Sequence, residues 1–459
     1  MPKVMPRPTV LHGQNKLHGQ NKLQQATLIP RALITAERYV SRAWMEKEAD
    51  VLWPRMWLFA CLERDLDQPG EYRVANIGDE SILITRTKAG TLAAFYNVCQ
   101  HRGARVIVND HGWVANFVCP YHGWTYDYTG LLNVVPEIEG FAGRIDCAER
   151  SLKPVRVESW LGMVWICMDP AAAPLREFLG PVADIVAPYQ LEHMQLMEDQ
   201  TVHLDCNWKA VYDNFGELYH VEHIHPQHQM VFDCPTSQIH LYENGHTGVV
   251  IDGHTVNTRL PIPEELNAYL AHRARTYGGN PADYSGRVLA LRKDIQKLRR
   301  EAGPRLGYDY SALTDERLSD IEQYNIFPNT MITVQPDEAL VMRARPHPTD
   351  PNKCLWDKFT FRRPPSADLA RKAGATLAPE ATADSETYQR PSHDEFTQDE
   401  IIVGNKTMTI TIDQDIHLIR DVQAGMRSRG FNTAMLSDEE ARVQHYHDWL
   451  DHFMSVQAQ

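Results

Sequence analysis

Two short motifs of cysteine and histidine constrain this chain more than any other feature. They are Cys99-x-His101 and Cys119-x-x-His122, and seventeen residues separate them. Together they supply two thiolates and two imidazoles. Such a ligand set suits either a tetrahedral zinc ion or a two-iron cluster of mixed ligation. We therefore expect a metal centre that is formed by two loops.

The residues around these motifs predict how the loops are held. The pattern predicts strands over residues 92–98 and 113–118, each of which leads into one of the cysteines. Gly103 and Gly123 follow the two histidines. Glycine lets the backbone approach closely and turn its N–H groups toward sulfur. Each pair of ligands is therefore expected in a loop at the end of a strand.

This segment resembles the Rieske family, in which two cysteines hold one iron and two histidines hold the other. The match rests on the two motifs, their spacing and the sequence Cys119-Pro-Tyr-His122-Gly-Trp124. The resemblance implies a [2Fe–2S] cluster on Cys99, His101, Cys119 and His122. Such a cluster is easier to reduce than an all-cysteine cluster, because neutral imidazole replaces thiolate. A zinc knuckle with the same four ligands is the alternative.

Length and composition bound the class of protein. The 459 residues allow two or three domains, and 43% of them are hydrophobic. No apolar run reaches the ~18 residues that span a bilayer, and the first residues lack the apolar core of a signal peptide. The net charge of -14 argues against nucleic acid or an anionic membrane as partner. Of the eight cysteines only Cys99 and Cys119 have ligand spacing, so we expect a cytoplasmic protein in a reducing compartment.

The first half of the chain is predicted to hold the cluster. Short strands at regular spacing predict a small all-β domain over about residues 52–170. A helix over 41–53 precedes it, and the stretch 170–174, three alanines between two prolines, marks its end. We assign residues 41–175 to this Rieske domain and residues 185–455 to a second, larger domain.

Residues 1–40 are interpreted as an N-terminal tail, or as an arm on a neighbouring subunit. They contain a duplication, in which His12–Leu17 is followed by the same six residues at His18–Leu23. Two copies are too few for a solenoid.

The larger domain mixes helices and strands, so the fold class is α+β. The expected elements are helices over 207–221, 280–302, 412–427 and 438–453, a hairpin of 330–334 with 339–342, and a strand over 354–361. The segment 280–302 is rich in Arg and Lys, and we interpret it as a solvated helix face. Residues 364–398 are polar, contain four prolines and are expected to form a long surface loop.

The predicted helix over 207–221 carries a second group of ionisable residues. Asp213, Glu217 and His220 recur at intervals of four and three, so they form one stripe on a helix. Such a stripe on an otherwise apolar helix indicates a functional site, although a solvated face is the alternative. His223 and His225 follow closely. Helix geometry favours His220 with His223, whereas Pro226 ends the helix and lets His225 converge, so periodicity leaves this choice open.

A second resemblance decides between these histidines. His220-x4-His225-Pro, preceded by Asp213-Asn-Phe and Glu217-x-Tyr-His, is similar to the mononuclear iron motif of Rieske non-haem iron oxygenases. These are the catalytic α subunits of ring-hydroxylating and related oxygenases. The resemblance implies that His220 and His225 bind Fe(II) together with one carboxylate, and that His223 is a bystander. It also implies a catalytic domain whose antiparallel sheet wraps around helices, of the helix-grip type.

The third ligand is expected from a helix that offers Asp413, Asp415 and Asp421. The apolar stripe of this helix consists of Ile412, Ile416, Ile419, Val422 and Met426. At ~100° per residue, Asp415 lies about 40° from the centre of the stripe, Asp413 about 120° away and Asp421 on the far side. Asp415 also matches the acidic position of the family, followed by Ile and later by Gln423-x-Gly. We therefore expect Asp415 as the metal ligand.

Glu217 is expected to connect the two centres. In the family, a carboxylate three residues before the first histidine bridges a Rieske histidine of one subunit to an iron ligand of the next. The resemblance thus implies an electron path from His101 or His122 through Glu217 to His220. It further implies a homotrimer, and Asp213 is expected to orient a ligand or the bridge. At the position of Glu217, many aromatic-ring dioxygenases have Asp, whereas Glu occurs in other branches, including the quaternary-ammonium oxygenases.

The resulting hypothesis is an oxygenase component that receives electrons from NAD(P)H through a reductase, with or without a ferredoxin. It would use O₂ at Fe(II) to hydroxylate an apolar substrate, aromatic or polycyclic. Monooxygenation or demethylation of a non-arene or quaternary-ammonium substrate uses the same ligands and is the alternative. A Rieske electron-transfer protein and a zinc-binding scaffold are the non-enzyme alternatives. The need for a separate β subunit stays open.

Overall fold

The computed structural model describes residues 9–12, 29–377 and 388–455. The chain divides into two compact units. The smaller unit comprises residues 42–178 and 346–350. The larger unit comprises residues 179–345 and 351–455 together with the N-terminal segment that ends at Ser41. Within the described ranges, no helix combines the length and the apolar composition that crossing a bilayer requires.

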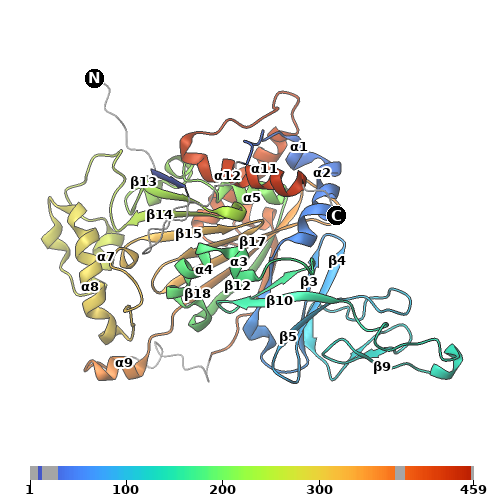
Figure 1. Ribbon diagram of the computed structural model, residues 1–459. Coiled ribbons are helices and arrows are strands. Elements are labelled where there is room, and N and C mark those ends of the chain that lie inside the picture. Colours follow the sequence, from blue (N-terminus) through green and yellow to red (C-terminus); the bar gives the residue numbers. More distant parts are fainter. Residues whose placement is uncertain (1–8, 13–28, 378–387, 456–459) are drawn as a thin grey trace, which may run out of the picture. The chain divides into compact units, whose positions relative to one another are not determined.

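The smaller unit is built from strands, which confirms the expected all-β domain. Its described residues form one sheet in the order β2-β11-β10-β5-β4-β3-β6 and another in the order β7-β8-β9 (Figure 1). The strands are β2 Leu58–Leu62, β3 Glu71–Ile77, β4 Glu80–Arg86, β5 Leu92–Tyr96, β6 His111–Trp113, β7 Phe117–Val118, β8 Thr125–Tyr126, β9 Leu132–Val134, β10 Pro154–Trp160 and β11 Met163–Cys167. The helix expected over 41–53 is a helical segment of three kinds: α2 Arg42–Lys47, a π-helical turn Glu48–Leu52 and a 3-10 turn Trp53–Arg55.

One predicted strand of this unit is wrong in its extent. Instead of a continuous strand over 113–118, β6 ends at Trp113 and pairs with β3, whereas β7 starts at Phe117 and pairs with β8. The chain therefore changes sheet between these residues. Trp113 is 61% exposed and Phe117 is fully buried. The apolar character of Trp113 suggested a strand that packs into the core, but this side chain lies at the surface.

The larger unit is organised around one nine-stranded sheet of described residues, in the order β1-β13-β14-β15-β16-β17-β18-β12-β19. The strands are β1 Thr9–His12, β12 Gln195–Leu204, β13 Phe232–Leu241, β14 Thr247–Gly253, β15 Ile321–Ile326, β16 Thr330–Val334, β17 Glu338–Pro346, β18 Cys354–Arg362 and β19 His393–Thr397. The edge strand β1 is parallel to β13, and the other edge strand β19 is parallel to β12. The strands β13 through β17 pair antiparallel in sequence, and so do β12 and β18. The predicted hairpin is β16 with β17, and the predicted strand is β18.

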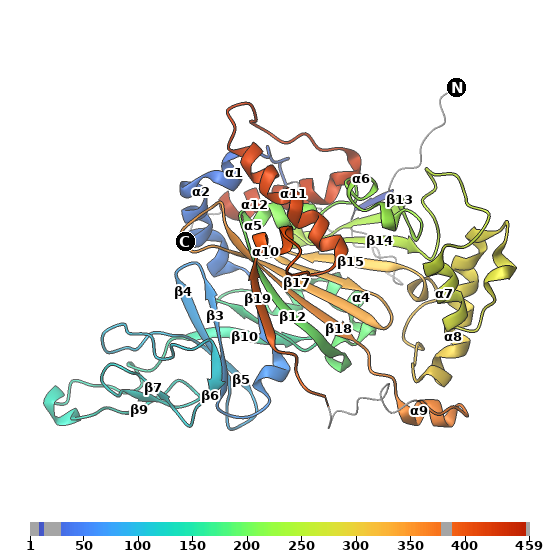
Figure 2. The ribbon, with the colours of Figure 1, turned by 180° about the vertical axis from the view of Figure 1, so that it is seen from behind.

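Helices cover both faces of this sheet, as Figure 2 shows from behind. The helices of this unit are α1 Glu37–Val40, α4 Pro181–Val186, α5 Trp208–Asn214, α6 Val221–Ile224, α7 Ala268–Thr276, α8 Leu291–Leu306, α9 Ala367–Lys372, α10 Gln398–Ile402, α11 Ile410–Met426 and α12 Ala441–Ser455, while α3 Leu175–Leu179 lies at the boundary of the two units. Gln323 of β15 accepts a hydrogen bond from Arg442 of α12, at 3.0 Å. The adjacent Glu322 binds Arg317, whose guanidinium also donates to the Ile185 carbonyl of α4. Successive residues of a strand face opposite sides, so α12 and α4 lie on opposite faces.

Two expectations for the larger unit are corrected. The stretch 364–398 is not one loop, because it contains α9 and the strand β19, which pairs with β12. Only Phe396 of β19 is buried, and an edge strand with one apolar residue gives little periodic signal. The charged helix starts at residue 291 rather than 280, because Pro281 begins a separate 3-10 turn. Residues 378–387 of the predicted loop lie outside the described residues.

The N-terminal segment joins the larger unit where it is described. β1 adds to the sheet beside β13. The Arg38 guanidinium pairs with Asp451 of α12 at 2.6 Å, and the Ala36 N–H donates to the Asn432 carbonyl at 2.9 Å. Residues 29–41 are thus packed against the rest of the larger unit and do not form a free tail. Of the duplication, residues 13–23 lie outside the described residues.

Candidate metal centres

The two loops of the smaller unit share one backbone pattern. The N–H groups of Cys99 and Cys119 each donate to the carbonyl five residues later, at 2.8 and 2.9 Å. The N–H groups of Gly103 and Gly123 each donate back to the cysteine carbonyl, at 3.0 Å in both loops. Both glycines have positive φ, +78° and +71°, where a side chain would strain the backbone. The loops therefore present one cysteine and one histidine each in matching geometry.

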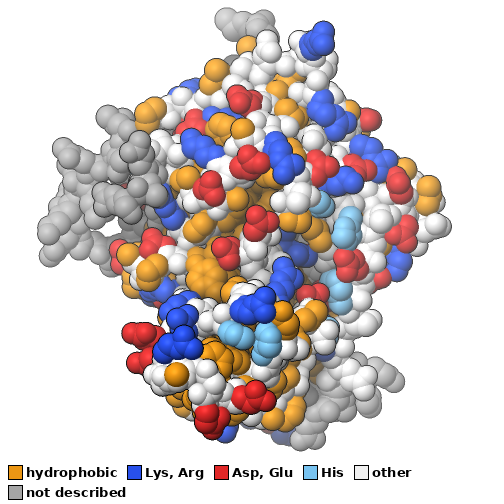
Figure 3. Space-filling view, turned by 90° about the vertical axis from the view of Figure 1, so that its right-hand side faces the viewer, with side chains coloured by type: hydrophobic (Ala, Val, Ile, Leu, Met, Phe, Trp, Pro, Cys, Tyr) orange, Lys and Arg blue, Asp and Glu red, His pale blue; other side chains and the backbone are white. Residues whose placement is uncertain are grey.

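The two imidazoles of these loops lie together. The rings of His101 and His122 have their centroids 4.6 Å apart, and His101 stacks on Trp124 at 4.9 Å. The Nδ1 atom of His101 is buried and has no hydrogen-bond partner among the described residues. His122 is exposed, as is the neighbouring Arg102. Histidine side chains reach the surface beside Lys and Arg side chains on the face drawn in Figure 3.

The two thiols lie behind the imidazoles, with each cysteine only 2% exposed. The Tyr126 hydroxyl accepts the Gln100 N–H at 3.0 Å and lies 3.3 Å from Cys99 Sγ, so its own proton can point at sulfur. Burial raises the pKa of Cys99, and the Tyr126 hydrogen bond offsets only part of this rise. A buried thiolate in this place therefore calls for a positive partner, which a metal cluster supplies.

These four residues fit a cluster better than a single ion. Ligands of one tetrahedral zinc lie within about 4 Å of one another, given metal–ligand distances of about 2.0–2.3 Å. Within the described residues, three or more such donor atoms lie within 4.8 Å of one another only at His220, His225 and Asp415. No three of the four described Cys/His donors lie this close together. The Cys/His donors are thus too widely spaced for a zinc knuckle, while a two-iron cluster spans a larger distance.

The second group of donors is placed by a turn rather than by a helix face, which corrects one expectation. The helix predicted over 207–221 is only α5, which ends at Asn214, and α6 starts at Val221. Glu217 and His220 therefore do not share a helical stripe with Asp213. Gly216 lies in this break: a Cβ there would lie 2.9 Å from Val443 of α12, so a larger residue would require its surroundings to shift.

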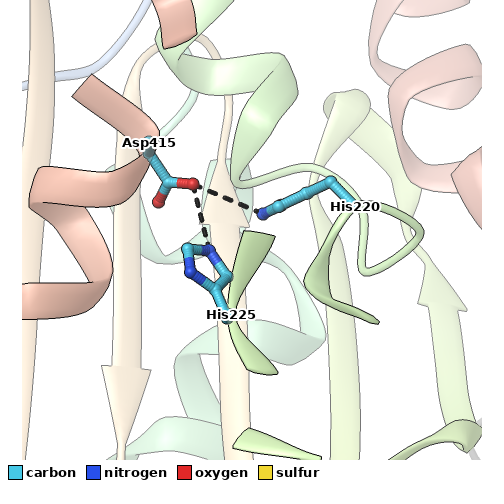
Figure 4. A group of neighbouring side chains, drawn as sticks. All are labelled: His220, His225 and Asp415. Atoms are coloured by element: carbon cyan, nitrogen blue, oxygen red, sulfur yellow. Dashed lines mark ion pairs between the residues drawn. The ribbon is translucent and has the colours of Figure 1, made fainter. Parts of the chain in front are cut away.

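Three donor atoms converge at this turn (Figure 4). Asp415 Oδ1 lies 3.0 Å from His225 Nε2 and 3.6 Å from His220 Nε2. The two histidines come from the ends of the α6 turn, and Asp415 comes from α11, about 190 residues later in the chain. Asp415 is 4% exposed, whereas Asp413 is half-buried and Asp421 exposed. Asp413 instead accepts hydrogen bonds from the Thr407 hydroxyl and the Met408 N–H.

The environment of Asp415 fits a metal ion. Its Oδ1 atom is buried and has no hydrogen-bond partner among the described residues, although both imidazoles face it. A buried carboxylate oxygen without a partner is costly, and a cation held between it and two neutral imidazoles removes this cost. Two histidines and one carboxylate on one face are the ligand set of non-haem iron(II) sites. His220, His225 and Asp415 can therefore hold mononuclear iron, while the exposed His223 lies outside this group.

Each histidine of this group is held through its other ring nitrogen. Glu217 Oε1 lies 2.5 Å from His220 Nδ1, and Glu217 Oε2 accepts the backbone N–H groups of Tyr219 and His220. Burial lowers the pKa of His220, but Glu217 and Asp415 outweigh it and raise the pKa above its ordinary value. His225 Nδ1 lies 2.8 Å from the amide oxygen of Gln414 on α11. Both imidazoles thus direct Nε2 toward Asp415.

Asp213 lies behind this group rather than in it. Its carboxylate accepts the Tyr39 hydroxyl at 2.5 Å and lies 3.1 Å from His447 Nε2. Among the described residues it makes no hydrogen bond to the three donors or to Glu217. The expectation that Asp213 directly orients a ligand or the bridge therefore has no contact to support it, and the residue instead ties α5 to α12 and to the N-terminal segment.

Sequence reasoning missed three residues that surround the donors. Gln414 binds His225 as described above. His228 lies 2.9 Å from the Thr411 hydroxyl, and burial together with the nearby His225 lowers its pKa to about 4. Arg442 is 1% exposed and lies near Glu217, and burial lowers its pKa to about 10. Arg442 and Gln414 occur in helices, where arginine and glutamine usually face solvent, so the residue type does not indicate a site. The sequence does show that Gln414 is next to the expected ligand Asp415.

Comparison with known proteins agrees with this division. A family model described as Ring hydroxylating alpha subunit (catalytic domain) matches residues 191–456, and one described as Rieske [2Fe-2S] domain matches residues 56–148. The first of these covers more than half of the chain. The matched ranges contain the mononuclear donors and the Cys/His loops, respectively.

Two curated relatives illustrate the range of activities around this chain. A glycine betaine monooxygenase oxygenase subunit of Chromohalobacter salexigens is 34% identical over 176 residues, which are 37% of this chain and 38% of that protein. The large oxygenase component of a naphthalene 1,2-dioxygenase system of Pseudomonas aeruginosa is 34% identical over 187 residues, 39% of this chain and 41% of that protein. The matches thus span about two fifths of either relative.

Solved structures share the fold over nearly the whole chain. A quaternary ammonium Rieske monooxygenase, CntA, in complex with L-carnitine covers 93% of this chain and is covered to 96%, with a TM-score of 0.63 and 18% identity. A naphthalene 1,2-dioxygenase with indole bound covers 94% of this chain and is covered to 94%, with a TM-score of 0.64 and 19% identity. Fold, domain matches and relatives lead to one conclusion: the chain belongs to the ring-hydroxylating alpha subunit family and carries a Rieske [2Fe–2S] domain before its catalytic domain.

Proposed function

We propose that this chain is the oxygenase component of a multicomponent Rieske system. It would take electrons from NAD(P)H through a reductase, with or without a ferredoxin, and use O₂ to hydroxylate a small organic substrate. The convergence of His220, His225 and Asp415 within 4.8 Å, in a chain that also carries the Cys/His loops, is the observation that supports this most. An electron-transfer protein would need the loops but not the second group of donors.

The residues around each centre have assignable roles in this proposal. Cys99, Cys119, His101 and His122 would hold the cluster, and His220, His225 and Asp415 would hold iron(II). When bound, the cluster supplies electrons and the iron supplies the activation of O₂. Glu217 accepts the His220 Nδ1 proton, so it fixes the ring with Nε2 toward the metal. A carboxylate on this imidazole also makes it a stronger electron donor.

An apolar cluster beside the donors supports an apolar substrate. Val221 directly follows His220 and packs with buried residues of β13 and β14. The cluster consists of Val221, Cys234, Ile239, Leu241, Val249 and Ile251, with Leu218, Phe232 and Ile321 packed against it. Val221 thus connects the turn that carries His220 to an apolar core. Hydroxylation of an aromatic or polycyclic compound is therefore our first candidate.

Monooxygenation of a quaternary-ammonium compound is the second candidate. It is favoured by Glu217, which is longer than the aspartate of many aromatic-ring dioxygenases. It is also favoured by the similarity to the glycine betaine monooxygenase subunit and to CntA. The metal donors themselves are the same for both reactions, so they do not separate the candidates.

We further propose a homotrimer in which the cluster of one subunit serves the iron of the next. Glu217 would lie on the path between them, and a related quaternary ammonium Rieske monooxygenase has been described with inter-subunit electron transfer. Size measurement in solution, together with activity of mixed trimers, tests this. Trimers that combine a Cys99→Ala subunit with an Asp415→Ala subunit should regain activity only if electrons cross between subunits.

Product analysis tests the proposed function. The purified protein with a generic reductase is incubated with naphthalene, glycine betaine and carnitine under ¹⁸O₂. Two labelled oxygen atoms in a ring diol would support the first candidate, and one labelled atom with loss of a methyl group as formaldehyde would support the second. Absence of oxygen uptake with a broad panel, in a protein that holds both metals, would contradict the oxygenase proposal.

A further inference from the structure

The two histidines of the mononuclear group are held by partners of different charge. His220 Nδ1 faces the carboxylate of Glu217 at 2.5 Å, whereas His225 Nδ1 faces the neutral amide of Gln414 at 2.8 Å. Both partners are close enough for a full hydrogen bond. The two imidazoles therefore differ in their partner, although they have the same residue type and the same direction of Nε2.

Gln414 also contacts a second glutamine, Gln227. Its oxygen accepts from Gln227 Nε2 at 2.8 Å, and its own Nε2 donates to Gln227 Oε1 at 3.5 Å. The same amide oxygen lies 2.8 Å from His225 Nδ1. An amide oxygen only accepts, so His225 Nδ1 must carry the proton. The neutral ring then has a lone pair on Nε2, as a metal ligand requires.

Asp415 lies at the other nitrogen of the His225 ring. Asp415 Oδ1 lies 3.0 Å from His225 Nε2 and yet has no hydrogen-bond partner among the described residues. His225 Nε2 thus faces Asp415, whereas His225 Nδ1 faces Gln414. Helix α11 supplies both contacts, because Gln414 and Asp415 are neighbours on it.

We propose that Gln414 is a positioning residue: it holds His225 in the metal-binding tautomer, and its neutrality keeps His225 a weaker electron donor than His220. This inference deepens the proposed function and rests on it. A carboxylate draws the Nδ1 proton and makes the ring a stronger donor, whereas an amide fixes the ring without adding charge. The site would then have one strongly donating histidine, on the side of Glu217, and one that mainly sets geometry.

Cobalt(II) binding to the purified protein tests this inference without turnover. Cobalt(II) is the probe because its visible absorption and shifted proton signals report on the ligand set. Gln414→Leu removes the acceptor and is expected to weaken cobalt(II) binding about 10–100-fold, as typical for loss of an outer hydrogen-bond partner. Gln414→Glu keeps an acceptor and is expected to bind at least as tightly as the wild type.

The exchangeable imidazole protons give a second readout. The cobalt(II) protein should show a shifted, slowly exchanging N–H signal for each of His220 and His225. In Gln414→Leu only the His225 signal should be lost, and in Gln414→Glu it should return at a changed position. A purely structural role of Gln414 would move neither signal selectively.

Gln227→Leu is the matched control, because it removes the neighbour of Gln414 but not its contact with His225. Its cobalt(II) affinity should stay close to that of the wild type. Wild-type affinity in Gln414→Leu, or an equal loss in Gln227→Leu, would overturn the inference. The proposed function requires the wild type to bind cobalt(II) and His225→Ala to lose this binding. If the wild type does not bind, or if His225→Ala binds equally well, the proposed function is overturned, and this inference with it.

Discussion

The two candidate metal centres are assembled in opposite ways. The Cys/His loops bring four donors from residues 99–122 of one small unit, and their backbones are closed by hydrogen bonds within each loop. The second group joins His220 and His225 to Asp415, and only the packing of α11 brings these together. The comparison teaches that the first centre depends on local backbone geometry, whereas the second depends on the tertiary structure around it.

Loss of Asp415 should have the largest effect and should separate the two centres. Asp415→Ala removes one of three metal donors. Loss of a residue that only hydrogen-bonds a metal ligand typically costs up to about 100-fold, so affinity for mononuclear iron and turnover should fall by more than this. The visible absorption of the Rieske cluster should stay. Iron analysis and absorption spectra of the same sample check this. Bleaching of the cluster in this variant would mean that the centres are not independent.

Glu217→Gln should leave both metals in place and slow the transfer between them. The amide still accepts a hydrogen bond from His220 but has lost the charge, so we expect a rate about 10–100-fold lower. Stopped-flow reoxidation of the reduced cluster by O₂ and substrate measures this rate. Full single-turnover activity would remove Glu217 from the path.

Tyr126→Phe should act on the first centre alone. The hydroxyl lies 3.3 Å from Cys99 Sγ, and a hydrogen bond to sulfur stabilises the more negative, reduced cluster. A net hydrogen-bond energy of about 0.5–1.5 kcal/mol corresponds to a reduction potential lower by about 20–60 mV. Redox titration of the cluster measures the shift. An unchanged potential would contradict the hydrogen bond from Tyr126 to Cys99. Loss of mononuclear iron would contradict an effect on the first centre alone.

Tyr39→Phe should have the smallest effect, and it should act on the larger unit. The variant loses the hydroxyl that donates to Asp213 and lies 3.0 Å from His447 Nε2, whereas the Asp213 carboxylate keeps its contact with His447. We expect the free energy of unfolding to fall by about 0.5–1.5 kcal/mol. Urea unfolding followed by tryptophan fluorescence, with cluster absorption as the second probe, measures this. Tyr219→Phe is the control, because Tyr219 is 53% exposed; an equal loss there would contradict the assigned role.

The same contrast decides what the sequence could predict. The Cys/His loops were predicted with all four residues, because spacing within one short segment reflects the geometry of one pair of loops. Asp415 was singled out from Asp413 and Asp421 by the apolar stripe of its helix, and the structure buries it alone among the three. Local periodicity thus predicts the direction of a side chain where a single helix determines it.

Other features depend on contacts that periodicity does not contain. The helix predicted through Glu217 and His220 ends at Asn214, and Gly216 in the following turn lies against Val443 of α12. The strand β19 pairs at a sheet edge with a mostly polar sequence. Gln414 has no pattern of its own, since its role arises only when α11 packs on the turn at His225. These contacts join residues far apart in the chain, and no local pattern reports them.

Metal content per chain tests the central claim most directly. We predict about three irons and about two acid-labile sulfides per chain, two irons in the cluster and one mononuclear. A mild chelator, or Asp415→Ala, should remove about one iron and leave the sulfide and the cluster absorption unchanged. Zinc in place of iron, or two irons with nothing bound at His220 and His225, would contradict an account in which this chain binds iron at two chemically distinct centres.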